Sequence, residues 1–223
     1  MVSRVQLAKM IDHSLLSPSV TDEDVRNGCR EALQYGFAAV VVNPSHIPIV
    51  TRELNNSAVK VCSVISFPFG LSATEVKLTE VTEALAHGAK EIDVVMNFSA
   101  LRSGKDKYVL DEIRKITDLV RRGGMKIVVK MIMETCYLNE QQKRKACFLA
   151  VEGGADFVKT STGFGVAGAT VEDVRLLRQT VGPNIGVKAA GGIRNLQDAL
   201  KMVEAGANRI GTSSSESILQ GFV

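Results

Sequence analysis

The chain has 223 residues, of which 45% are hydrophobic, 23% charged and 5% aromatic, and its formal net charge is +3. This composition is typical of a globular protein with an aliphatic core, and the length suits one large α/β unit. The charge is too small, and the lysines and arginines are too scattered, to indicate a nucleic-acid surface. We therefore expect no nucleic acid among the partners, whereas an anionic small molecule is compatible with the charge.

Four cysteines, at positions 29, 62, 136 and 147, lie far apart in the sequence. They form no Cys-x-x-Cys pair and have no accompanying histidine cluster, so we expect neither a metal site nor a disulfide framework. No apolar run approaches the roughly 20 residues that a membrane-spanning helix needs, and the first ten residues lack an apolar signal core. We expect a protein without a membrane anchor in the reducing cytoplasm.

Short β-branched runs alternate with longer amphipathic stretches along the chain. The runs predicted as strands are 9–12, 38–43, 59–66, 91–96, 126–133, 157–160, 185–189 and 209–211. The stretches predicted as helices are 21–35, 48–54, 73–86, 107–121, 139–152, 171–180 and 196–204. A Gly-Ala pair closes a helix and opens a strand at 88–89, 154–155 and 206–207, which indicates a repeated βα unit. We predict an α/β protein with a single-domain (β/α)8 TIM barrel over residues 1–223, with an open doubly wound sheet as the alternative.

Three lysines lie in predicted strands that are otherwise apolar enough for burial on both faces. Lys130, Lys159 and Lys188 are spaced 29 residues apart and then 29 again, in the fifth, sixth and seventh predicted strands. A buried ammonium needs a partner or loses its proton. If all three point inward, their amines converge at similar depth near the carboxyl ends of the strands, where barrel active sites lie. The alternative is that they flank the strands or reach solvent.

Crowded amines favour chemistry that needs a neutral amine. A free lysine has a pKa of about 10.4, but a neighbouring ammonium and partial desolvation both favour its neutral form. A neutral amine can attack a carbonyl and form a Schiff base. The spacing predicts such a nucleophile among the three lysines without selecting one of them.

Two aspartates lie in predicted strands of the same sheet. Asp93, in the fourth strand, is a candidate general base that acts directly or through a water, or alternatively a structural ion-pair partner of one lysine. Asp12, at the end of the first predicted strand, is expected to hold a lysine or to bind a substrate hydroxyl. His13, His46 and His87 have no metal-ligand spacing, and we expect each of them to be structural.

Turns rich in glycine and serine follow the last three predicted strands. Thr162-Gly163 follows the sixth strand, Gly191-Gly192 the seventh and Ser213-Ser214 the eighth. Glycines let backbone N–H groups approach an anion closely, and a short helix after the serines would add its positive end. The loops after strands seven and eight are the usual phosphate site of this barrel, so we predict a phosphate site there.

Two runs of the sequence are distinctive, Asp-Phe-Val-Lys-Thr-Ser-Thr-Gly-Phe at 156–164 and Val-Lys-Ala-Ala-Gly-Gly-Ile-Arg at 187–194. Both resemble runs of the 2-deoxyribose-5-phosphate aldolase family. Further runs at 11–13, 42–44, 66–70, 91–97, 130–135 and 209–214 are similar to the same family in the same order. The resemblance therefore covers nearly the whole chain.

This resemblance implies a class I aldolase that needs no cofactor and no metal. It would reversibly cleave 2-deoxy-D-ribose 5-phosphate to D-glyceraldehyde 3-phosphate and acetaldehyde, which would be its small-molecule partners. It further implies that Lys159 forms the Schiff base, that Lys188 lowers its pKa and that Asp93 handles protons with a water. Asp12, Lys130 and Thr162 would support the network or bind substrate, and the phosphate would be held by Gly163, Gly191, Gly192, Ser213 and Ser214. Such barrels often form homo-oligomers, and we expect a dimer or a tetramer.

The sequence leaves two alternatives open. Another Schiff-base aldolase or lyase with the same barrel would act on a different sugar phosphate. A non-catalytic sugar-phosphate-binding protein would keep the phosphate turns but would not need a neutral amine. The presence of Lys159, Lys188 and Asp93 together argues against this second alternative.

Overall fold

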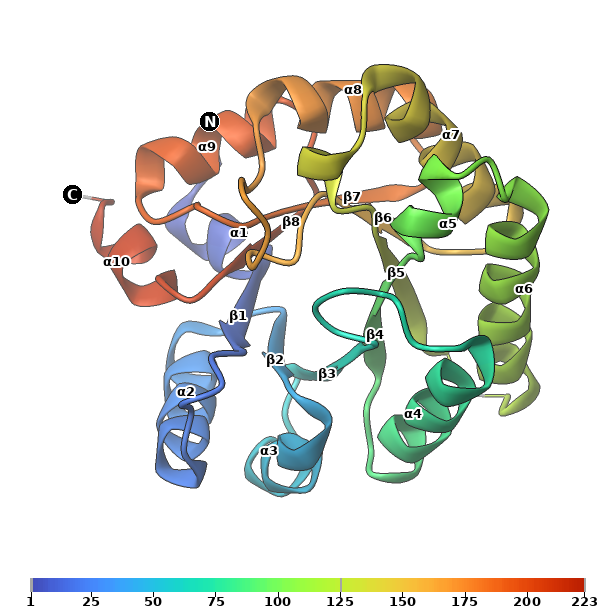
Figure 1. The fold of residues 1–223 in the computed structure, drawn as a ribbon. Helices are drawn as coiled ribbons and strands as arrows, with labels where there is room; N and C mark the ends of the chain where they lie inside the picture. Colours follow the sequence, from blue (N-terminus) through green and yellow to red (C-terminus); the bar gives the residue numbers. More distant parts are fainter. Residues whose placement is uncertain (1, 125, 223) are drawn as a thin grey trace.

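The computed structural model describes residues 2–124 and 126–222, and in these residues eight parallel strands close into a barrel surrounded by helices (Figure 1). Each strand pairs with the next, and β8 pairs with β1, so the barrel has no free edge. The predicted (β/α)8 fold is confirmed, and the open-sheet alternative is wrong. Residues 1, 125 and 223 of the expected 1–223 domain lie outside the described residues.

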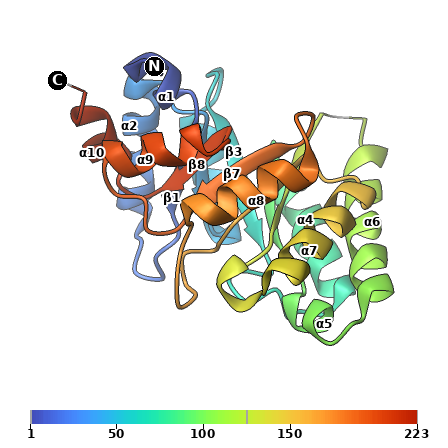
Figure 2. The ribbon, with the colours of Figure 1, turned by 90° about the horizontal axis from the view of Figure 1, so that it is seen from above.

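The strands have the following bounds: β1 Ile11–Leu15, β2 Ala39–Val42, β3 Lys60–Ile65, β4 Glu91–Val95, β5 Val128–Ile132, β6 Phe157–Lys159, β7 Gly186–Ala190 and β8 Arg209–Thr212. The α-helices are α1 Arg4–Ala8, α2 Asp22–Tyr35, α3 Ile47–Glu53, α4 Thr74–Ala86, α5 Phe98–Arg102, α6 Asp106–Arg122, α7 Glu140–Glu152, α8 Val171–Val181, α9 Leu196–Glu204 and α10 Ser215–Gln220. Two short 3-10 helices, η1 Pro44–His46 and η2 Thr135–Tyr137, follow β2 and β5. Figure 2 gives the view from above, in which the amino and carboxyl ends lie on the same side of the barrel.

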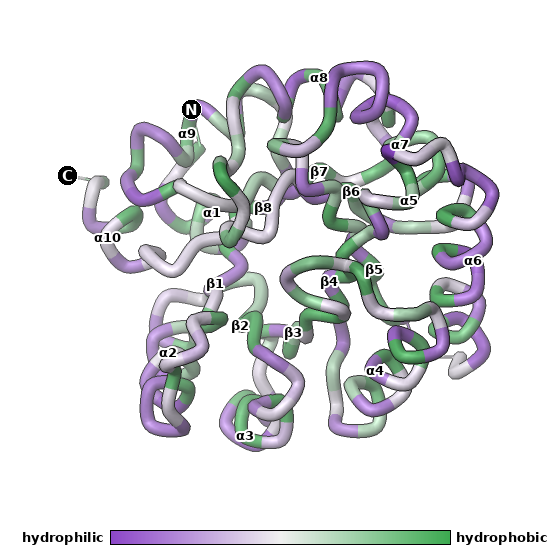
Figure 3. Tube along the Cα trace, viewed as in Figure 1, coloured by the Kyte–Doolittle hydropathy of each residue, from purple (hydrophilic) through white to green (hydrophobic). Residues whose placement is uncertain are grey.

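Side-chain caps set the starts of several helices and explain why their predicted bounds are close to the observed ones. Thr21 caps α2 and forms a capping box with Asp24, and Asn139 does the same for α7 with Gln142. Gly36 ends α2 in the left-handed conformation. The helices then turn their polar faces outward, as the hydrophilic segments on the outer turns of α2 and α6 show (Figure 3).

The first predicted strand, 9–12, is wrong at both ends. Lys9 and Met10 form the turn that follows the short helix α1, whereas Leu15 still pairs with Val42 of β2. Asp12 is therefore the second residue of its strand and lies deep in the barrel, not at the strand end that we expected. Both α1 and α5 were missed because five residues are too few to show a helical period.

The interior of the barrel has an apolar half and a charged half. On the apolar half, Leu16 packs with side chains of β2 and β3, and Phe67 covers this cluster; its other members are Ala39, Val41, Cys62 and Val64. The outward faces of the strands pack against the helices in a larger apolar core. Charged side chains of β1 and β4 to β8 fill the other half, so this barrel contains a buried ionic network in place of the usual aliphatic filling.

The registers of neighbouring strands stack the inward-facing residues in layers drawn from alternate strands. The lower layer holds Ala39, Glu91, Phe157 and Arg209, the middle layer Asp12, Cys62, Lys130 and Lys188, and the upper layer Val41, Asp93, Lys159 and Gly211. The expected similar depth is therefore right for Lys130 and Lys188, which share a layer. Lys159 lies one layer nearer the carboxyl ends of the strands.

Gly211 leaves the room that the Lys188 side chain occupies. A Cβ atom on Gly211 would lie 3.0 Å from Lys188 Cε and 2.9 Å from the Cβ of Ala190. The contact with Ala190 is too short for two carbon atoms and the one with Lys188 is tight, so a side chain at position 211 would force its neighbours to shift. The lack of a side chain at Gly211 thus helps the barrel to accommodate an inward lysine on β7.

A second buried ion pair lies outside the barrel wall, between α4 and α6. Lys77 Nζ lies 2.6 Å from Glu112 Oε1 and donates a hydrogen bond to the carbonyl of Val95 at 3.0 Å. Both side chains are almost completely inaccessible to solvent. Burial lowers the pKa of Lys77, and the Glu112 carboxylate opposes this effect. The pair ties two helices to the end of β4.

Replacement of one partner of this pair should destabilise the fold more than replacement of both. Lys77→Met leaves the Glu112 carboxylate buried without its cation, which costs about 3–5 kcal/mol of unfolding free energy. The double variant Lys77→Met with Glu112→Leu removes both charges and should recover most of that loss. Urea unfolding of the three proteins measures the difference, and equal losses in the single and double variants would contradict this account.

Candidate active site

Asp93 lies at the centre of the charged half of the interior and binds three lysine amines. Its Oδ2 atom accepts hydrogen bonds from Lys159 Nζ and from Lys188 Nζ, both at 2.7 Å. Its Oδ1 atom accepts one from Lys130 Nζ at 3.0 Å. All four side chains are buried. The three lysines therefore converge, as the sequence predicted, and the carboxylate that they share is that of Asp93.

The three amines differ in the number of carboxylates that they contact. Among the described residues, Lys159 Nζ contacts one carboxylate, that of Asp93. Lys188 Nζ contacts two, because it also lies 2.5 Å from Asp12 Oδ2. Lys130 Nζ contacts three, with Glu91 Oε2 at 2.5 Å and Asp12 Oδ2 at 3.6 Å in addition to Asp93. A carboxylate stabilises an ammonium, so Lys159 is the least stabilised cation of the three.

Burial disfavours the charged form of each amine, and the carboxylates decide which amine keeps its proton. Burial lowers the pKa of Lys159, and the neighbouring ammonium of Lys188 acts in the same direction, while Asp93 opposes both. Burial also acts to lower the pKa of Lys188 and of Lys130, but their carboxylate partners outweigh it and raise both pKa values. Of the three lysines, Lys159 is the one whose pKa shift favours the neutral amine.

For Asp93, burial and the neighbouring charges act on the pKa in opposite directions, and the charges prevail. Burial acts to raise this pKa, but the three ammonium groups outweigh it and hold the pKa well below its ordinary value. Asp93 is therefore an ionised carboxylate that stores no proton. The sequence left two roles open for Asp93, a general base and an ion-pair partner of a lysine. The structure shows the ion pairs, and Asp93 also lies within hydrogen-bond distance of Lys159.

Two charged residues of the lower layer, Arg209 and Glu91, join the network although neither was predicted as a site residue. Arg209 Nε donates a hydrogen bond to Asp12 Oδ1 at 2.7 Å, and Arg209 Nη2 donates one to Glu91 Oε2 at 2.7 Å. Glu91 lies two residues before Asp93, so the alternation of side chains along a strand places both on the same face. This spacing in the sequence could have identified Glu91 as part of the site. Asp12 is fully buried and binds Lys188 and Arg209, which fits its expected part in holding a lysine.

The network has one more cation than it has carboxylates. Its cations are Lys130, Lys159, Lys188 and Arg209, and its carboxylates are Asp12, Glu91 and Asp93. When every group is ionised, an excess of one positive charge is buried, which is unfavourable in a region of low dielectric. Loss of one proton makes the network neutral. Lys159 gives up that proton most readily because it has the fewest carboxylate partners.

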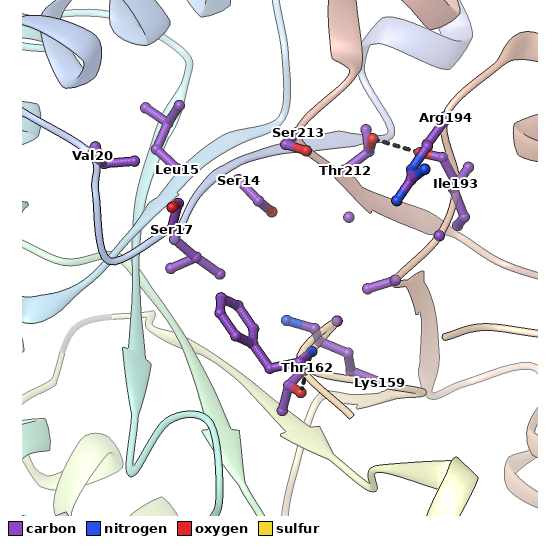
Figure 4. Close-up of a pocket in the computed structure, with 17 residues that line it drawn as sticks. Ser14, Leu15, Ser17, Val20, Lys159, Thr162, Ile193, Arg194, Thr212 and Ser213 are labelled. Atoms are coloured by element: carbon purple, nitrogen blue, oxygen red, sulfur yellow. Dashed lines mark hydrogen bonds between the residues drawn. The ribbon is translucent and has the colours of Figure 1, made fainter. Parts of the chain in front are cut away.

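A cavity of about 380 Å³ opens over Lys159 at the carboxyl ends of the strands. Its walls come from the segments that follow β1, β6, β7 and β8. Figure 4 shows Lys159 and Thr162 on one side of this space, with Ser213 and Arg194 across from them. Among the described residues, Lys159 is the one lysine of the network that lines the cavity. A small carbonyl compound in the cavity can thus reach this amine.

Backbone amides line the cavity where the glycine turns form its rim. Gly163, Gly191 and Gly192 all have positive φ angles, of 89°, 89° and 80°. A Cβ atom on Gly192 would meet no atom within 4 Å, so its backbone faces open space. Among the described residues, no backbone or side-chain group accepts a hydrogen bond from the amides of Gly163, Gly192 or Ser213. These amides are available to an anion.

The predicted phosphate-binding residues lie at this rim with one exception. Gly163, Gly191, Gly192 and Ser213 line the cavity, whereas Ser214 does not, and its amide donates to Thr212 Oγ1 at 2.9 Å. The short helix α10 begins one residue later, as the sequence indicated. Arg194 also lines the cavity and adds a positive charge to its wall (Figure 4), although it was not among the residues predicted for the site.

Thr162 also lines the cavity, but its donors are already engaged. Its amide lies 3.3 Å from Glu134 Oε2, and its hydroxyl donates a hydrogen bond to the same carboxylate. Glu134, which belongs to the segment after β5, was not among the residues predicted for the site. Its contact with Thr162 joins the ends of two neighbouring strands, and nothing in the local sequence signals it.

Other groups considered from the sequence lie apart from this cavity. His13 is buried outside the barrel wall, with Nδ1 2.8 Å from Ser215 Oγ, and burial lowers its pKa to about 4. All four cysteines are free thiols. In residues 2–124 and 126–222, no group of three or more His, Cys, Asp or Glu side chains could hold a metal ion, and no helix is long and apolar enough to cross a membrane.

The fold and the site together define a barrel enzyme whose cavity holds a buried lysine amine of lowered pKa and is lined by residues with free backbone amides. Comparison with known proteins is consistent with this class. The model of the DeoC/LacD family aldolases matches residues 6–221. The chain therefore belongs to the DeoC/LacD aldolase family, and it is an enzyme of the lyase class.

Individual relatives agree over the full length. A deoxyribose-phosphate aldolase of Carboxydothermus hydrogenoformans is 51% identical over 100% of this chain and 98% of the relative. One of Thermococcus gammatolerans is 54% identical over 97% of this chain and 96% of the relative. The solved structure of the tetrameric deoxyribose phosphate aldolase of Aeropyrum pernix superposes with a TM-score of 0.93 at 39% identity, covering 100% of this chain and 93% of that chain. The family resemblance seen in the sequence is confirmed.

Removal of the Lys188 charge should move the pH dependence of Lys159 upward. In Lys188→Met the ammonium that helps to lower the pKa of Lys159 is gone, so that pKa rises and a higher pH is needed for the neutral amine. We expect the rate at which borohydride and acetaldehyde modify Lys159 to fall by at least about tenfold at pH 7 and to recover partly at higher pH. The rate is measured by mass spectrometry across a pH series.

The matched control is Lys201→Met, which removes a lysine that is 51% exposed on α9. Its pH profile should coincide with that of the unchanged protein. A Lys188→Met profile that lies at the same pH, or at a lower one, would contradict the role given to the Lys188 charge.

Proposed function

We propose that this protein is a deoxyribose-phosphate aldolase that reversibly cleaves 2-deoxy-D-ribose 5-phosphate to D-glyceraldehyde 3-phosphate and acetaldehyde. The observation that carries the proposal is the position of Lys159, a buried amine with a lowered pKa that opens on the cavity with the free amides. The relatives named for this activity match the whole chain at about half of its positions. A carbonyl-attacking amine and an anion site in one cavity suit a phosphorylated aldehyde.

In the cleavage direction, the neutral amine of Lys159 attacks the C1 aldehyde of the open-chain sugar, and loss of water gives a protonated Schiff base. This iminium withdraws electrons from the C2–C3 bond. A base removes the proton of the C3 hydroxyl, the C2–C3 bond breaks, and D-glyceraldehyde 3-phosphate leaves. The electron pair of the broken bond remains on the enzyme as an enamine, which is protonated at C2. Hydrolysis of the resulting iminium then releases acetaldehyde and restores the amine.

Asp93 and Lys188 have distinct parts in these steps. Lys188 lies on the same Asp93 oxygen as Lys159, and its ammonium favours the neutral form of the nucleophile. Because ammonium groups hold the pKa of Asp93 low, we infer that this carboxylate passes protons through a water and does not store them. Lys130 and Asp12 lie one layer deeper and support the network through their ion pairs with Asp93 and Lys188.

The phosphate of the substrate is proposed to occupy the rim across from Lys159. The free amides of Gly163, Gly192 and Ser213 can donate hydrogen bonds to it, and Arg194 supplies a positive charge. Gly191 contributes through its backbone conformation, which shapes the turn beside Gly192. No such role is supported for the amide of Ser214, which is bound to Thr212.

The oligomeric state and the cellular location of this protein are proposed by analogy with its relatives and from its free thiols. One solved relative is described as a tetramer, and we propose a homo-oligomer for this chain as well. Four free thiols are compatible with a reducing compartment, so the cytoplasm remains the proposed location.

Borohydride reduction in the presence of acetaldehyde should leave a two-carbon adduct on Lys159, because reduction traps the Schiff base that the mechanism requires. Peptide mass spectrometry locates the adduct. Lys159→Ala should show no trapping and no cleavage of 2-deoxyribose 5-phosphate above background, whereas Lys201→Met should behave as the unchanged protein. An adduct on Lys130 or Lys188 would overturn the assignment of the nucleophile. Trapping without turnover of this sugar phosphate, but with turnover of another one, would favour a different aldolase of the same barrel.

A further inference from the structure

Glu134 combines two unfavourable features next to the proposed active site. Its backbone is left-handed, with φ 53° and ψ 63°, a conformation that residues with a Cβ atom seldom adopt. Its carboxylate is buried, with the residue 2% exposed. Strained backbone is retained when the surrounding structure requires it, and such residues cluster near functional sites. The contacts of Glu134 show what this conformation achieves.

The Glu134 carboxylate is bound by Thr162 across the gap between the ends of β5 and β6. The amide of Thr162 lies 3.4 Å from Oε1 and 3.3 Å from Oε2, and the Thr162 hydroxyl also donates to Oε2. Within the described residues, the remaining donor to this carboxylate is the Cys136 thiol, at 3.8 Å. No hydrogen bond from a lysine or arginine is among these contacts. A buried carboxylate without a cation depends on such hydrogen bonds, so Glu134 and Thr162 hold each other in place.

Thr162 in turn fixes the turn formed by residues 162–165. Its hydroxyl oxygen accepts a hydrogen bond from the amide of Phe164 at 3.0 Å. Gly165 packs directly on the carboxylate, since a Cβ atom there would lie 3.3 Å from Glu134 Cδ. The Phe164 ring meets Phe67 edge to face, with 5.2 Å between the ring centroids. The turn therefore wraps around one buried carboxylate.

This arrangement determines which amide of the turn remains available. The amide of Thr162 donates to the Glu134 carboxylate, and the amide of Phe164 donates to the Thr162 hydroxyl oxygen. The amide of Gly163, which lies between them, has no acceptor among the described residues, and Gly163 lines the cavity. Both donors of Thr162 point to Glu134, so Thr162 has none to offer a ligand. The orientation of the free Gly163 amide thus depends on a carboxylate that does not line the cavity.

We propose that Glu134 is a positioning residue for phosphate recognition, which holds the turn 162–165 so that the Gly163 amide faces the phosphate of the substrate. Thr162 is the link through which Glu134 acts, and neither side chain donates a hydrogen bond to the substrate. This inference rests on the proposed function, because it assumes a phosphorylated substrate in this cavity. It assigns Glu134 to phosphate recognition and not to the chemistry at Lys159.

Two independent substitutions interrupt the link. Glu134→Gln keeps the shape of the side chain but replaces one acceptor oxygen by a donor, and Thr162→Val removes the hydroxyl while it keeps the volume. We expect each to raise the KM for 2-deoxyribose 5-phosphate by about tenfold or more, with a smaller change in kcat. The rate of borohydride trapping with acetaldehyde, which carries no phosphate, should change by less than about twofold. Thr162→Ser keeps the hydroxyl and should restore a KM near that of the unchanged protein.

The control for a general loss of stability is Glu112→Gln, which alters a buried glutamate of the α4–α6 ion pair and should change neither quantity. Equal losses of phosphate affinity and of acetaldehyde trapping, or no change in KM, would overturn the inference. If Glu134→Gln fails to fold, the comparison of Thr162→Val with Thr162→Ser decides the question. Failure of the unchanged protein to trap acetaldehyde would instead refute the proposed function, so the two failures are distinguishable.

Discussion

The structure depends on one constraint, which is that three lysine amines share the carboxylate of Asp93 inside the barrel. Buried charges of one sign repel each other strongly. The network is therefore stable only if each ammonium has a carboxylate partner or loses its proton. The carboxylate partners are distributed unequally, with three for Lys130, two for Lys188 and one for Lys159. This inequality gives three chemically identical side chains different pKa values. The lowered pKa of Lys159 is thus a property of the whole network.

The barrel makes this arrangement possible because its layers bring alternate strands together. Asp12, Lys130 and Lys188 lie in one layer, Arg209 and Glu91 below it, and Asp93 with Lys159 above it. Ion pairs therefore form between layers as well as within them. The position of Lys159 in the upper layer gives its amine access to the cavity, while the deeper lysines remain enclosed. Fold and chemistry are connected through strand register, since a shift of one residue in β6 would turn Lys159 out of the barrel.

Much of the fold could be predicted from the sequence because periodicity and caps are local signals. The convergence of Lys130, Lys159 and Lys188 also follows from strand pattern and spacing. The depth of Asp12 was wrong because the turn at Lys9 and Met10 depends on a helix too short to recognise. The roles of Arg209 and Glu134 could not be predicted, because each depends on a side-chain contact with a residue from another part of the barrel, Asp12 of β1 for Arg209 and Thr162 after β6 for Glu134. The choice among the three lysines needed the family resemblance, whereas the structure supports it physically by the count of carboxylate partners.

The most direct test of the Asp93 network is an NMR titration of the side-chain amines in the free enzyme, with Lys130, Lys159 and Lys188 assigned through single substitutions. We expect Lys159 to lose its proton first, at a pH below that of an exposed lysine such as Lys201. Lys130 and Lys188 should remain protonated at pH values where an exposed lysine is already neutral. Deprotonation of Lys188 or Lys130 before Lys159, or a Lys159 titration that coincides with that of Lys201, would contradict the central claim.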